Sequence, residues 1–284
     1  MVSTKHLVWC ILACASSLAD GVAVPRASKC KPASPPDNTP DNTTGNSTKA
    51  AAPADQAKGF GNGVPLRIMP LGASITHGYK SSDGNGYRQD LRVALEKNGN
   101  KVNMVGERTG GTMKDDQSEG WEGYKVAQIH VKANKVVPEY KPNLILINAG
   151  TNDCIQNDDL PNAGNRMISM LNDIYKESPR ATIILSTLIV NANPKVQARV
   201  KDFNNQLKLL ADRYRAGGFR LVLVDMESDA GPKLTDLNKD GTHPTDAGYK
   251  KMANIFFDGI KQADEQHFLQ EAEKVDGIAD EGPN

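Results

Sequence analysis

The sequence has no net charge, because its 34 Lys and Arg residues are balanced by 34 Asp and Glu residues. This balance argues against a strongly basic nucleic-acid-binding protein and against an acidic solvating protein, so we expect no nucleic-acid partner. Apolar residues are also scarce: hydrophobic residues make up 38% of the chain and aromatic residues 5%, which is below the usual globular share. The low average predicts an ordinary core combined with a part of the chain that has none.

The chain also lacks a hydrophobic run long enough to cross a membrane. The apolar stretch at residues 7–19 has about a dozen residues, whereas a membrane-spanning helix needs roughly 20. Lys5 precedes this stretch and small residues end it, which is the layout of a secretory signal peptide. We predict a signal peptide over residues 1–19, cleaved after Ala19 or, as a second choice, after Ala23, and hence a secreted, extracellular protein. A buried N-terminal helix is the alternative, and it is disfavoured because no partner element follows.

Residues 25–58 contain no Leu, Ile, Val, Met or aromatic residue and hold six of the 16 prolines. Such a segment cannot bury enough apolar surface to offset the entropy lost on ordering. Two N-glycosylation sequons begin at Asn42 and Asn46. We therefore predict that residues 20–62 form a disordered linker, either a glycosylated stalk, which the secretory start favours, or a plain spacer.

Cysteine is rare as well. After removal of the signal peptide only Cys30 and Cys154 remain, and the sequence does not decide whether they pair. Cys154 as a catalytic nucleophile is the weaker hypothesis, because no general base accompanies it in the sequence and a better serine candidate exists.

Residues 63–262 are the predicted folded domain, in which short aliphatic runs alternate with amphipathic stretches. Nearly continuous aliphatic runs are typical of strands covered on both faces. The alternation predicts an α/β fold, a three-layer α/β/α sandwich with a central five-stranded parallel sheet. Residues 263–284 are rich in Asp and Glu, and we expect them to form a solvated acidic C-terminal tail. The expected strands are 66–71, 101–105, 143–148, 181–189 and 219–225, and the expected helices are 87–98, 126–140, 165–177 and 196–215.

Reactive side chains follow the expected strands, at the edge of the sheet where α/β proteins bind ligands. Ser74 lies on a tight turn after the first strand, Asn152 follows the third, and Asp240 and His243 follow the fifth. A serine hydroxyl needs an imidazole to accept its proton, and the imidazole needs a carboxylate to fix its tautomer. Ser74, His243 and Asp240 are therefore predicted to form a catalytic triad for acyl transfer. The candidate oxyanion donors are the Ser74 N–H, the Asn152 amide and the N–H of a glycine after the second strand.

Four sequence blocks, in this order, resemble those of the SGNH hydrolases, the superfamily of GDSL-type esterases and lipases. They are residues 70–76 around Ser74, residues 119–124, Gly150-Thr151-Asn152-Asp153 and Asp240-Gly241-Thr242-His243-Pro244. They are most similar to carbohydrate esterase family three, whose known members are acetyl xylan esterases with a flavodoxin-like fold. The resemblance implies that Ser74 is the nucleophile, His243 the base and Asp240 its partner.

The same resemblance assigns residues around the triad. It implies that Gly123, with Gly120 as a rival, and Asn152 hold the oxyanion, and that Asp153 orients the Asn152 loop. One departure stands out, since Ala73 occupies the position of the family's usual Asp. That aspartate is not a triad member, so we expect the change to affect loop packing rather than the chemistry.

His77 and Trp121 lie close to these blocks in the sequence. His77 either lines the substrate mouth or is a polar surface group, and Trp121 either packs under its loop or offers a ring face to a sugar. Residues 236–241 match the start of a calcium-binding loop, but Ala247 stands where that loop needs a bidentate Glu. We therefore predict no metal site and no cofactor.

Together these features predict a monomeric, secreted serine esterase that removes small acyl groups, mainly acetyl, from a polysaccharide such as xylan. Its partner would be the acetylated polysaccharide or another small acyl ester. The alternatives are a lipase or other carboxylesterase of the same fold, or a non-catalytic carbohydrate-binding surface protein.

Overall fold

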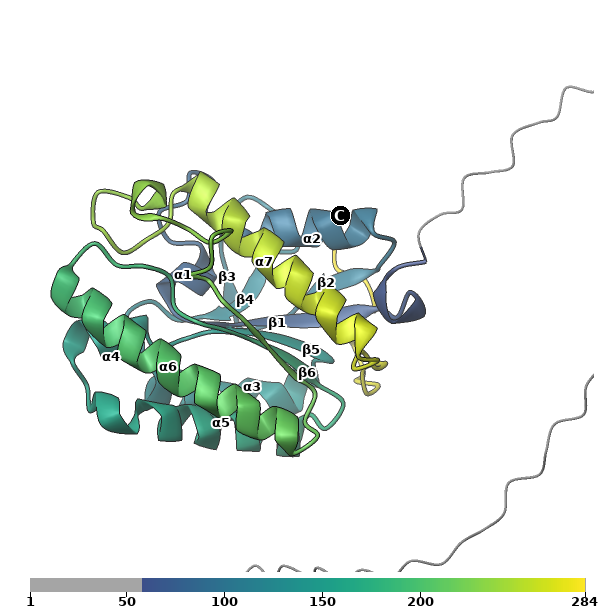
Figure 1. Cartoon of the computed structure of the whole chain (residues 1–284). Coiled ribbons are helices and arrows are strands. Elements are labelled where there is room, and N and C mark those ends of the chain that lie inside the picture. Colours follow the sequence, from purple (N-terminus) through teal and green to yellow (C-terminus); the bar gives the residue numbers. More distant parts are fainter. Residues whose placement is uncertain (1–57, 284) are drawn as a thin grey trace, which may run out of the picture. The chain divides into compact units, whose positions relative to one another are not determined.

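A central β-sheet lies between two layers of helices (Figure 1), in a computed structural model that describes residues 58–283. The predicted signal peptide, most of the predicted linker, both sequons and Cys30 lie outside the described residues. The predicted three-layer α/β/α fold is confirmed. The strands are β1 (Leu66–Gly72), β2 (Val102–Met104), β3 (Arg108–Thr109), β4 (Gln117–Gly120), β5 (Leu144–Asn148), β6 (Thr182–Ser186) and β7 (Leu221–Val224). The helices are α1 (Ser74–His77), α2 (Tyr87–Lys97), α3 (Val126–Tyr140), α4 (Thr151–Gln156), α5 (Ala163–Glu177), α6 (Pro194–Ala216) and α7 (Asp246–Glu265), with 3-10 turns η1 (Phe60–Asn62), η2 (Leu160–Asn162) and η3 (Leu234–Asp236).

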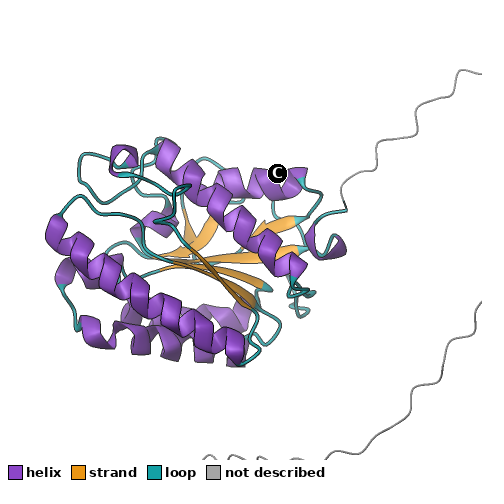
Figure 2. Ribbon diagram, in the orientation of Figure 1, coloured by secondary structure: helices purple, strands orange, loops and turns teal. Residues whose placement is uncertain are grey.

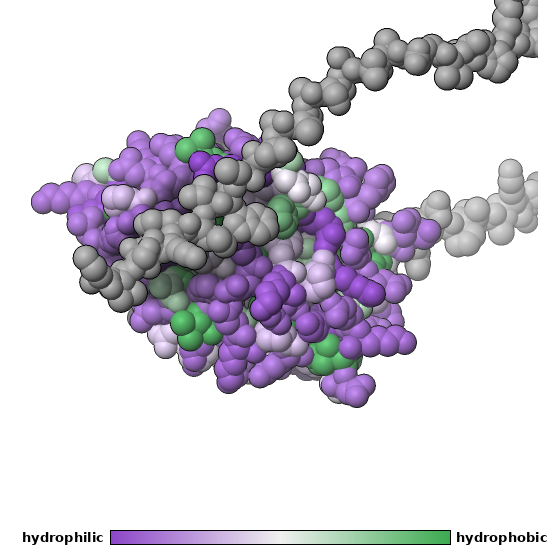
Figure 3. Space-filling model, turned by 90° about the horizontal axis from the view of Figure 1, so that it is seen from below, coloured by the Kyte–Doolittle hydropathy of each residue, from purple (hydrophilic) through white to green (hydrophobic). Residues whose placement is uncertain are grey.

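Each layer of helices covers one face of the sheet and buries an apolar stripe against it. Helices α2 and α7 pack together on one face, and α3, α5 and α6 pack on the other (Figure 2). The outer surface seen from below is mostly hydrophilic where it is visible, and its hydrophobic residues are scattered (Figure 3). Single exposed hydrophobic residues such as Val131 and Leu209 are normal on a protein surface. Within residues 58–283, no helix combines the length and the apolarity that crossing a membrane requires.

The five predicted strands are present, but the sheet has two more. Its order is β3-β4-β1-β5-β6-β7, with β2 pairing with β1 as well, and all pairs are parallel except β3 with β4. Strand β4 was not predicted because it has no aliphatic residue. Its Glu119 is fully buried, and the carboxylate accepts hydrogen bonds from the backbone N–H of Glu107 and from the Trp121 indole. A strand stabilised by a buried polar network leaves no hydrophobic pattern in the sequence.

Pro70 lies in the middle of β1, a place where proline would normally remove a ladder hydrogen bond. The carbonyls of Ile68 and Gly72 accept from Val105 N–H and Trp121 N–H, so these two residues face the β2 and β4 side. Pro70 lies two residues from each and faces the same side, between the part of β1 paired with β2 and the part paired with β4. The proline therefore occupies the point at which one neighbouring strand replaces the other.

The acidic C-terminal segment is not a free solvated tail, which corrects the expectation for it. Helix α7 continues to Glu265, and residues 268–282, called here the C-terminal strap, cross the edge of the sheet at which the parallel strands begin. Carbonyl oxygens of the strap accept hydrogen bonds from four side chains at the strand starts: Thr182 to Phe268 (2.8 Å), Asn143 to Gln270 (2.7 Å), Arg67 to Glu273 (2.9 Å) and Asn103 to Ala279 (2.6 Å). The strap satisfies polar groups that would otherwise need water.

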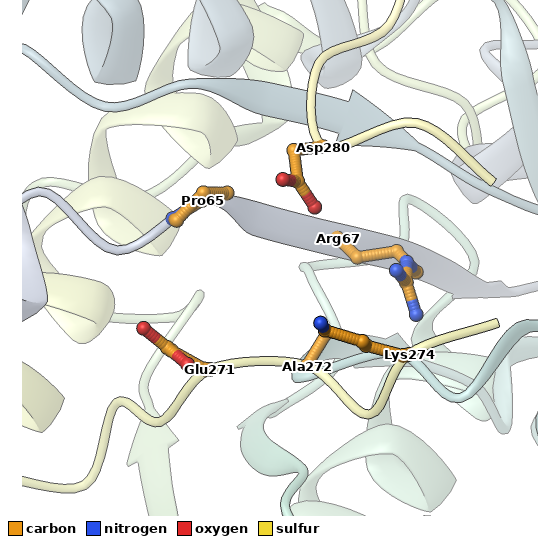
Figure 4. A pocket seen from close by; sticks show the side chains of 6 residues that line it. All are labelled: Pro65, Arg67, Glu271, Ala272, Lys274 and Asp280. Carbon is orange, nitrogen blue, oxygen red and sulfur yellow. The ribbon is translucent and has the colours of Figure 1, made fainter.

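A small cavity lies between the strap and the start of β1 (Figure 4). Figure 4 shows the Arg67 side chain between Asp280 and Lys274. The Arg67 side chain is almost fully buried and also donates to the carbonyls of Tyr140 and Lys141. The cavity is at the opposite end of β1 from Ser74, roughly 20 Å away for a strand of this length.

Removing the strap should destabilise the domain without touching the Ser74 side of the sheet. A chain ending at Leu269 loses three of the four side-chain bonds and the bond from Gly282 N–H to the Val102 carbonyl. At ~1 kcal/mol for each bond, we expect the free energy of unfolding to fall by about 2–5 kcal/mol. Urea unfolding would measure this loss, with a chain lacking only residues 283–284 as the control. Equal stability of the two truncated chains would contradict the role given to the strap.

Candidate active site

Ser74 lies on a tight turn between β1 and α1, as the sequence predicted. Strand β1 ends at Gly72, Ala73 is the extended N-cap residue (φ −113°, ψ −145°), and Ser74 is the first residue of the helix. Ala73 is 5% exposed and belongs to the apolar core on one side of the sheet. The alanine that replaces the family's usual aspartate is thus an ordinary core residue.

His243 and Asp240 come together with Ser74 in one hydrogen-bonded chain. The Ser74 Oγ lies 2.8 Å from His243 Nε2, and His243 Nδ1 lies 2.7 Å from Asp240 Oδ2. The other oxygen, Asp240 Oδ1, accepts from the backbone N–H groups of Thr242 and His243 at 3.0 Å each. With the Nδ1 proton directed at the carboxylate, Nε2 is left as the acceptor for the serine hydroxyl. The three side chains predicted to form the triad are thus each within hydrogen-bonding distance of the next.

The electrostatics of Asp240 keep its carboxyl group ionised. Partial burial alone would raise the pKa of Asp240, but a hydrogen-bonded Lys80 ammonium and the N–H groups of His243 and Thr242 outweigh it and lower the pKa well below its usual range. Lys80 Nζ lies 2.9 Å from Asp240 Oδ2. The carboxylate therefore remains charged throughout the pH range in which an imidazole titrates.

Asn152 is held by the turn that carries Gly123. Its side-chain Nδ2 donates to the Tyr124 carbonyl at 2.9 Å, from the second position of helix α4. An amide nitrogen carries two protons, so this bond fixes the orientation of the group and leaves the second proton for another acceptor.

The two candidate glycines of the oxyanion site have different surroundings. Gly123 has a φ of +77° in a turn that the Tyr124 N–H closes on the Trp121 carbonyl (3.1 Å), and nothing lies within 4 Å of the place a Cβ would occupy. Its own N–H takes no part in that turn bond. Gly120 is buried in β4, where a Cβ would lie 2.5 Å from the His77 backbone nitrogen. Close packing explains Gly120, and the open surroundings of Gly123 favour it as the donor.

Asp153 joins the Asn152 helix to its neighbours. It is fully buried; its Oδ2 accepts from the Val126 N–H at the start of α3, and its Oδ1 contacts Arg166 Nη2, both at 3.0 Å. Arg166 also donates to the carbonyls of Asp158 and Asp159. These contacts fit the predicted orienting role of Asp153.

Trp121 and His77 are both partly buried beside the 121–124 turn. The Trp121 ring stacks on Tyr124 with centroids 5.6 Å apart, and it is also contacted by Arg108 and by Lys132, whose Nζ lies 3.7 Å from the ring centroid. Because protein side chains already contact the ring, the structure favours a packing role for Trp121 over a role as a platform for a sugar. His77 Nε2 lies 3.9 Å from Glu122 Oε1, and burial, followed by the charge of Arg88, lowers the pKa of His77.

Two alternatives weighed from the sequence find no support in the geometry. Cys154 is a fully buried free thiol, and burial, together with the Asp153 charge, raises its pKa to about 12, which makes it a poor nucleophile. In the calcium-like segment, Asp236 pairs with Lys251 at 2.6 Å and Asp240 belongs to the His243 chain. Among residues 58–283 no group of three or more His, Cys, Asp or Glu side chains is placed to hold a metal ion.

Sequence reasoning missed Tyr79 and Lys80, which both contact the Ser74–His243–Asp240 chain. The Tyr79 ring packs edge-on against the His243 ring, with centroids 4.9 Å apart, and Lys80 pairs with Asp240. Neither residue belongs to a recognised block, and no periodic pattern marks them. The one feature that marks them is their proximity to Ser74 in the sequence, and this does not predict a contact with residues 240 and 243.

Comparison with known proteins identifies the family of the chain. The model of the family "GDSL-like Lipase/Acylhydrolase" matches residues 68–256. A multidomain esterase of Ruminococcus flavefaciens is 26% identical over 227 residues, which cover 69% of this chain and 28% of that protein. The chain thus spans less than a third of the length of this curated relative.

Solved structures with the same fold include two carbohydrate esterases. A family 3 carbohydrate esterase of Clostridium thermocellum has a TM-score of 0.64 and 24% identity, covering 71% of this chain and 98% of that one. A carbohydrate esterase family 3 structure from Talaromyces cellulolyticus has a TM-score of 0.60 and 21% identity, covering 71% and 99%. The family match spans the site and most of the sheet, and the chain therefore belongs to the GDSL-like lipase/acylhydrolase family of carboxylic ester hydrolases.

Proposed function

We propose that this chain is a secreted serine esterase that hydrolyses acetyl or similarly small acyl esters on a polysaccharide such as xylan. The observation that carries the proposal is the continuous hydrogen-bonded chain from Ser74 through His243 to Asp240, at 2.8 and 2.7 Å. The likeness to carbohydrate esterases of family 3 supports the choice of substrate class. Secretion rests on the N-terminal sequence pattern alone.

Acylation begins when Ser74 Oγ attacks the ester carbonyl carbon and its proton passes to His243 Nε2. The oxyanion that forms is held by the N–H groups of Ser74 and Gly123 and by the free proton of the Asn152 amide. Asp240 stabilises the imidazolium and keeps the ring in position. The ester C–O bond then breaks, His243 gives its proton to the departing sugar oxygen, which leaves as a hydroxyl group, and the acyl group remains on Ser74.

Deacylation repeats the sequence with water. His243 removes a proton from a water molecule, whose oxygen attacks the acyl carbon, and the same donors hold the second oxyanion. Collapse of this intermediate returns the proton to Ser74 Oγ and releases the carboxylic acid. No group beyond the chain's own residues and water is needed for the balance.

A small acyl group on a large substrate fits the surroundings of Ser74. The side chains of His243 and Asp240 are 15% and 25% exposed, so the site lies near the surface, where a side group of a polymer can reach it. Of the exposed large hydrophobic residues in the described part of the chain, Tyr79 contacts the site, and the rest are Val93, Val131, Ile155, Leu209, Phe219 and Leu234. A single aromatic ring offers little apolar surface to a long acyl chain, which favours an acetylesterase over a lipase.

Acetate release from acetylated xylan, pectin, mannan and chitin tests the substrate class. We expect release from at least one polymer, and faster turnover of p-nitrophenyl acetate than of p-nitrophenyl palmitate, because the surroundings of Ser74 offer the longer chain little to bind. Preference for the palmitate ester would favour the lipase. Folded protein that a fluorophosphonate probe does not label would favour the non-catalytic carbohydrate-binding protein.

A further inference from the structure

We infer that Lys80 is a positioning residue of this esterase: its ammonium group fixes the Asp240 carboxylate that orients the His243 ring. The inference rests on the function proposed above. Lys80 Nζ and His243 Nδ1 share the same carboxylate oxygen, Asp240 Oδ2, at 2.9 and 2.7 Å.

The Asp240 carboxylate is fully occupied only when Lys80 is present. Its Oδ1 accepts two backbone N–H bonds, and its Oδ2 accepts the imidazole and the ammonium. Each carboxylate oxygen has about two lone-pair sites, so these four donors use the whole group. Without Lys80, Oδ2 keeps the imidazole as its one protein donor, and the carboxylate is freer to rotate away from the ring.

The backbone around Lys80 is held in a conformation that directs the side chain to this point. Lys80 has a φ of +65°, in the left-handed region that non-glycine residues seldom adopt. The carbonyl of Tyr79 accepts from the Tyr249 hydroxyl at 2.7 Å, and the carbonyl of Lys80 accepts from Asn238 Nδ2 at 3.3 Å. Strained residues that the surrounding structure holds in place are frequent at functional sites.

The ammonium group also changes the electrostatics of the site. The hydrogen bond to Asp240 raises the pKa of Lys80, so the ammonium group stays protonated at neutral pH. A cation on Oδ2 offsets part of the negative charge of the carboxylate beside the imidazole ring, so its removal leaves the site more negative. Other titratable or charged groups around this corner come from α7 and the loop before it: Tyr249, Asp246, Asp236 and Lys251.

Lys80→Met keeps the apolar stem and removes the charge, and Lys80→Arg keeps the charge. For Lys80→Met we expect the acidic limb of the profile of kcat/KM against pH to move to higher pH by about 0.5 unit, the size typical of an exposed ion pair. We also expect kcat on the plateau to fall several-fold while KM stays constant, because the carboxylate is less well fixed. Lys80→Arg should restore both. The matched control is Lys239→Met, which removes an exposed lysine next to Asp240 in the sequence.

The rate of fluorophosphonate labelling as a function of pH gives the same information without a known substrate. An unmoved acidic limb and an unchanged plateau in Lys80→Met would overturn the inference, and so would the same shift in Lys239→Met. Circular dichroism and thermal melting verify that each variant is folded, and Lys80→Gln serves as a second neutral variant. Absence of labelling in the wild-type protein would instead overturn the proposed function, so the two failures are distinguishable.

Discussion

A Ser74→Ala variant should lose at least about 10⁴-fold in kcat for p-nitrophenyl acetate, because no other described side chain shares the His243 Nε2 contact. The residual rate would come from the oxyanion donors and from His243 acting on water. The variant should remain folded, since Ser74 is only partly buried and loses a single hydroxyl group. Steady-state kinetics and circular dichroism measure the two quantities.

The exposed Ser82 supplies a matched control for this experiment. Ser82→Ala should keep wild-type turnover and remain labelled by a fluorophosphonate, whereas Ser74→Ala should not be labelled. Turnover of Ser74→Ala near the wild-type value, or labelling at another residue, would show that a different nucleophile is used.

Asn152→Ala should lower kcat by about 10²–10³-fold, which is the usual cost of removing one oxyanion donor. The bond from Asn152 Nδ2 to the Tyr124 carbonyl orients the amide before substrate arrives, so the truncation removes a fixed donor rather than a mobile one. Fluorophosphonate labelling should persist at a reduced rate, because Ser74 and His243 are unchanged. Kinetics with p-nitrophenyl acetate would measure the loss.

Asn165→Ala, at an exposed position of α5, is the control for the loss of an asparagine side chain. We expect it to match the wild type. If Asn152→Ala also matched the wild type while remaining folded, the oxyanion role of Asn152 would be wrong, although the roles of Ser74 and His243 would be unaffected.

Much of this molecule could be predicted from its sequence because its central strands and its reactive blocks carry local signals. The aliphatic run of β5 is covered on both faces, and such a short continuous run is typical of a buried strand. The pairing of Asp240 with His243 needs only three residues of separation and a turn, so its geometry also follows from the sequence.

The remaining features depend on contacts between distant segments. In strand β4, Glu119 accepts hydrogen bonds from Glu107 and Trp121, and nothing in a segment of three polar residues and a glycine predicts those partners. Lys80 and Asp240 are 160 positions apart in the sequence. Their ion pair depends on a left-handed backbone conformation at Lys80, which the residue type does not predict. The hydrogen bonds of residues 268–282 could not be predicted either. Their acceptors are main-chain carbonyls, which every residue has, so the composition of the segment does not indicate them.

The hydrogen bonds made by residues 268–282 also determine when the domain can finish folding during synthesis. Side chains at the starts of β1, β2, β5 and β6 each donate a hydrogen bond to a main-chain carbonyl of this segment, which the ribosome makes after every strand of the sheet. A nascent chain that has exposed all seven strands still lacks these partners, and partly paired sheets are the forms that proteases and aggregation act upon. The final step of folding, and with it resistance to proteolysis, should therefore follow the emergence of residue 282 from the ribosome.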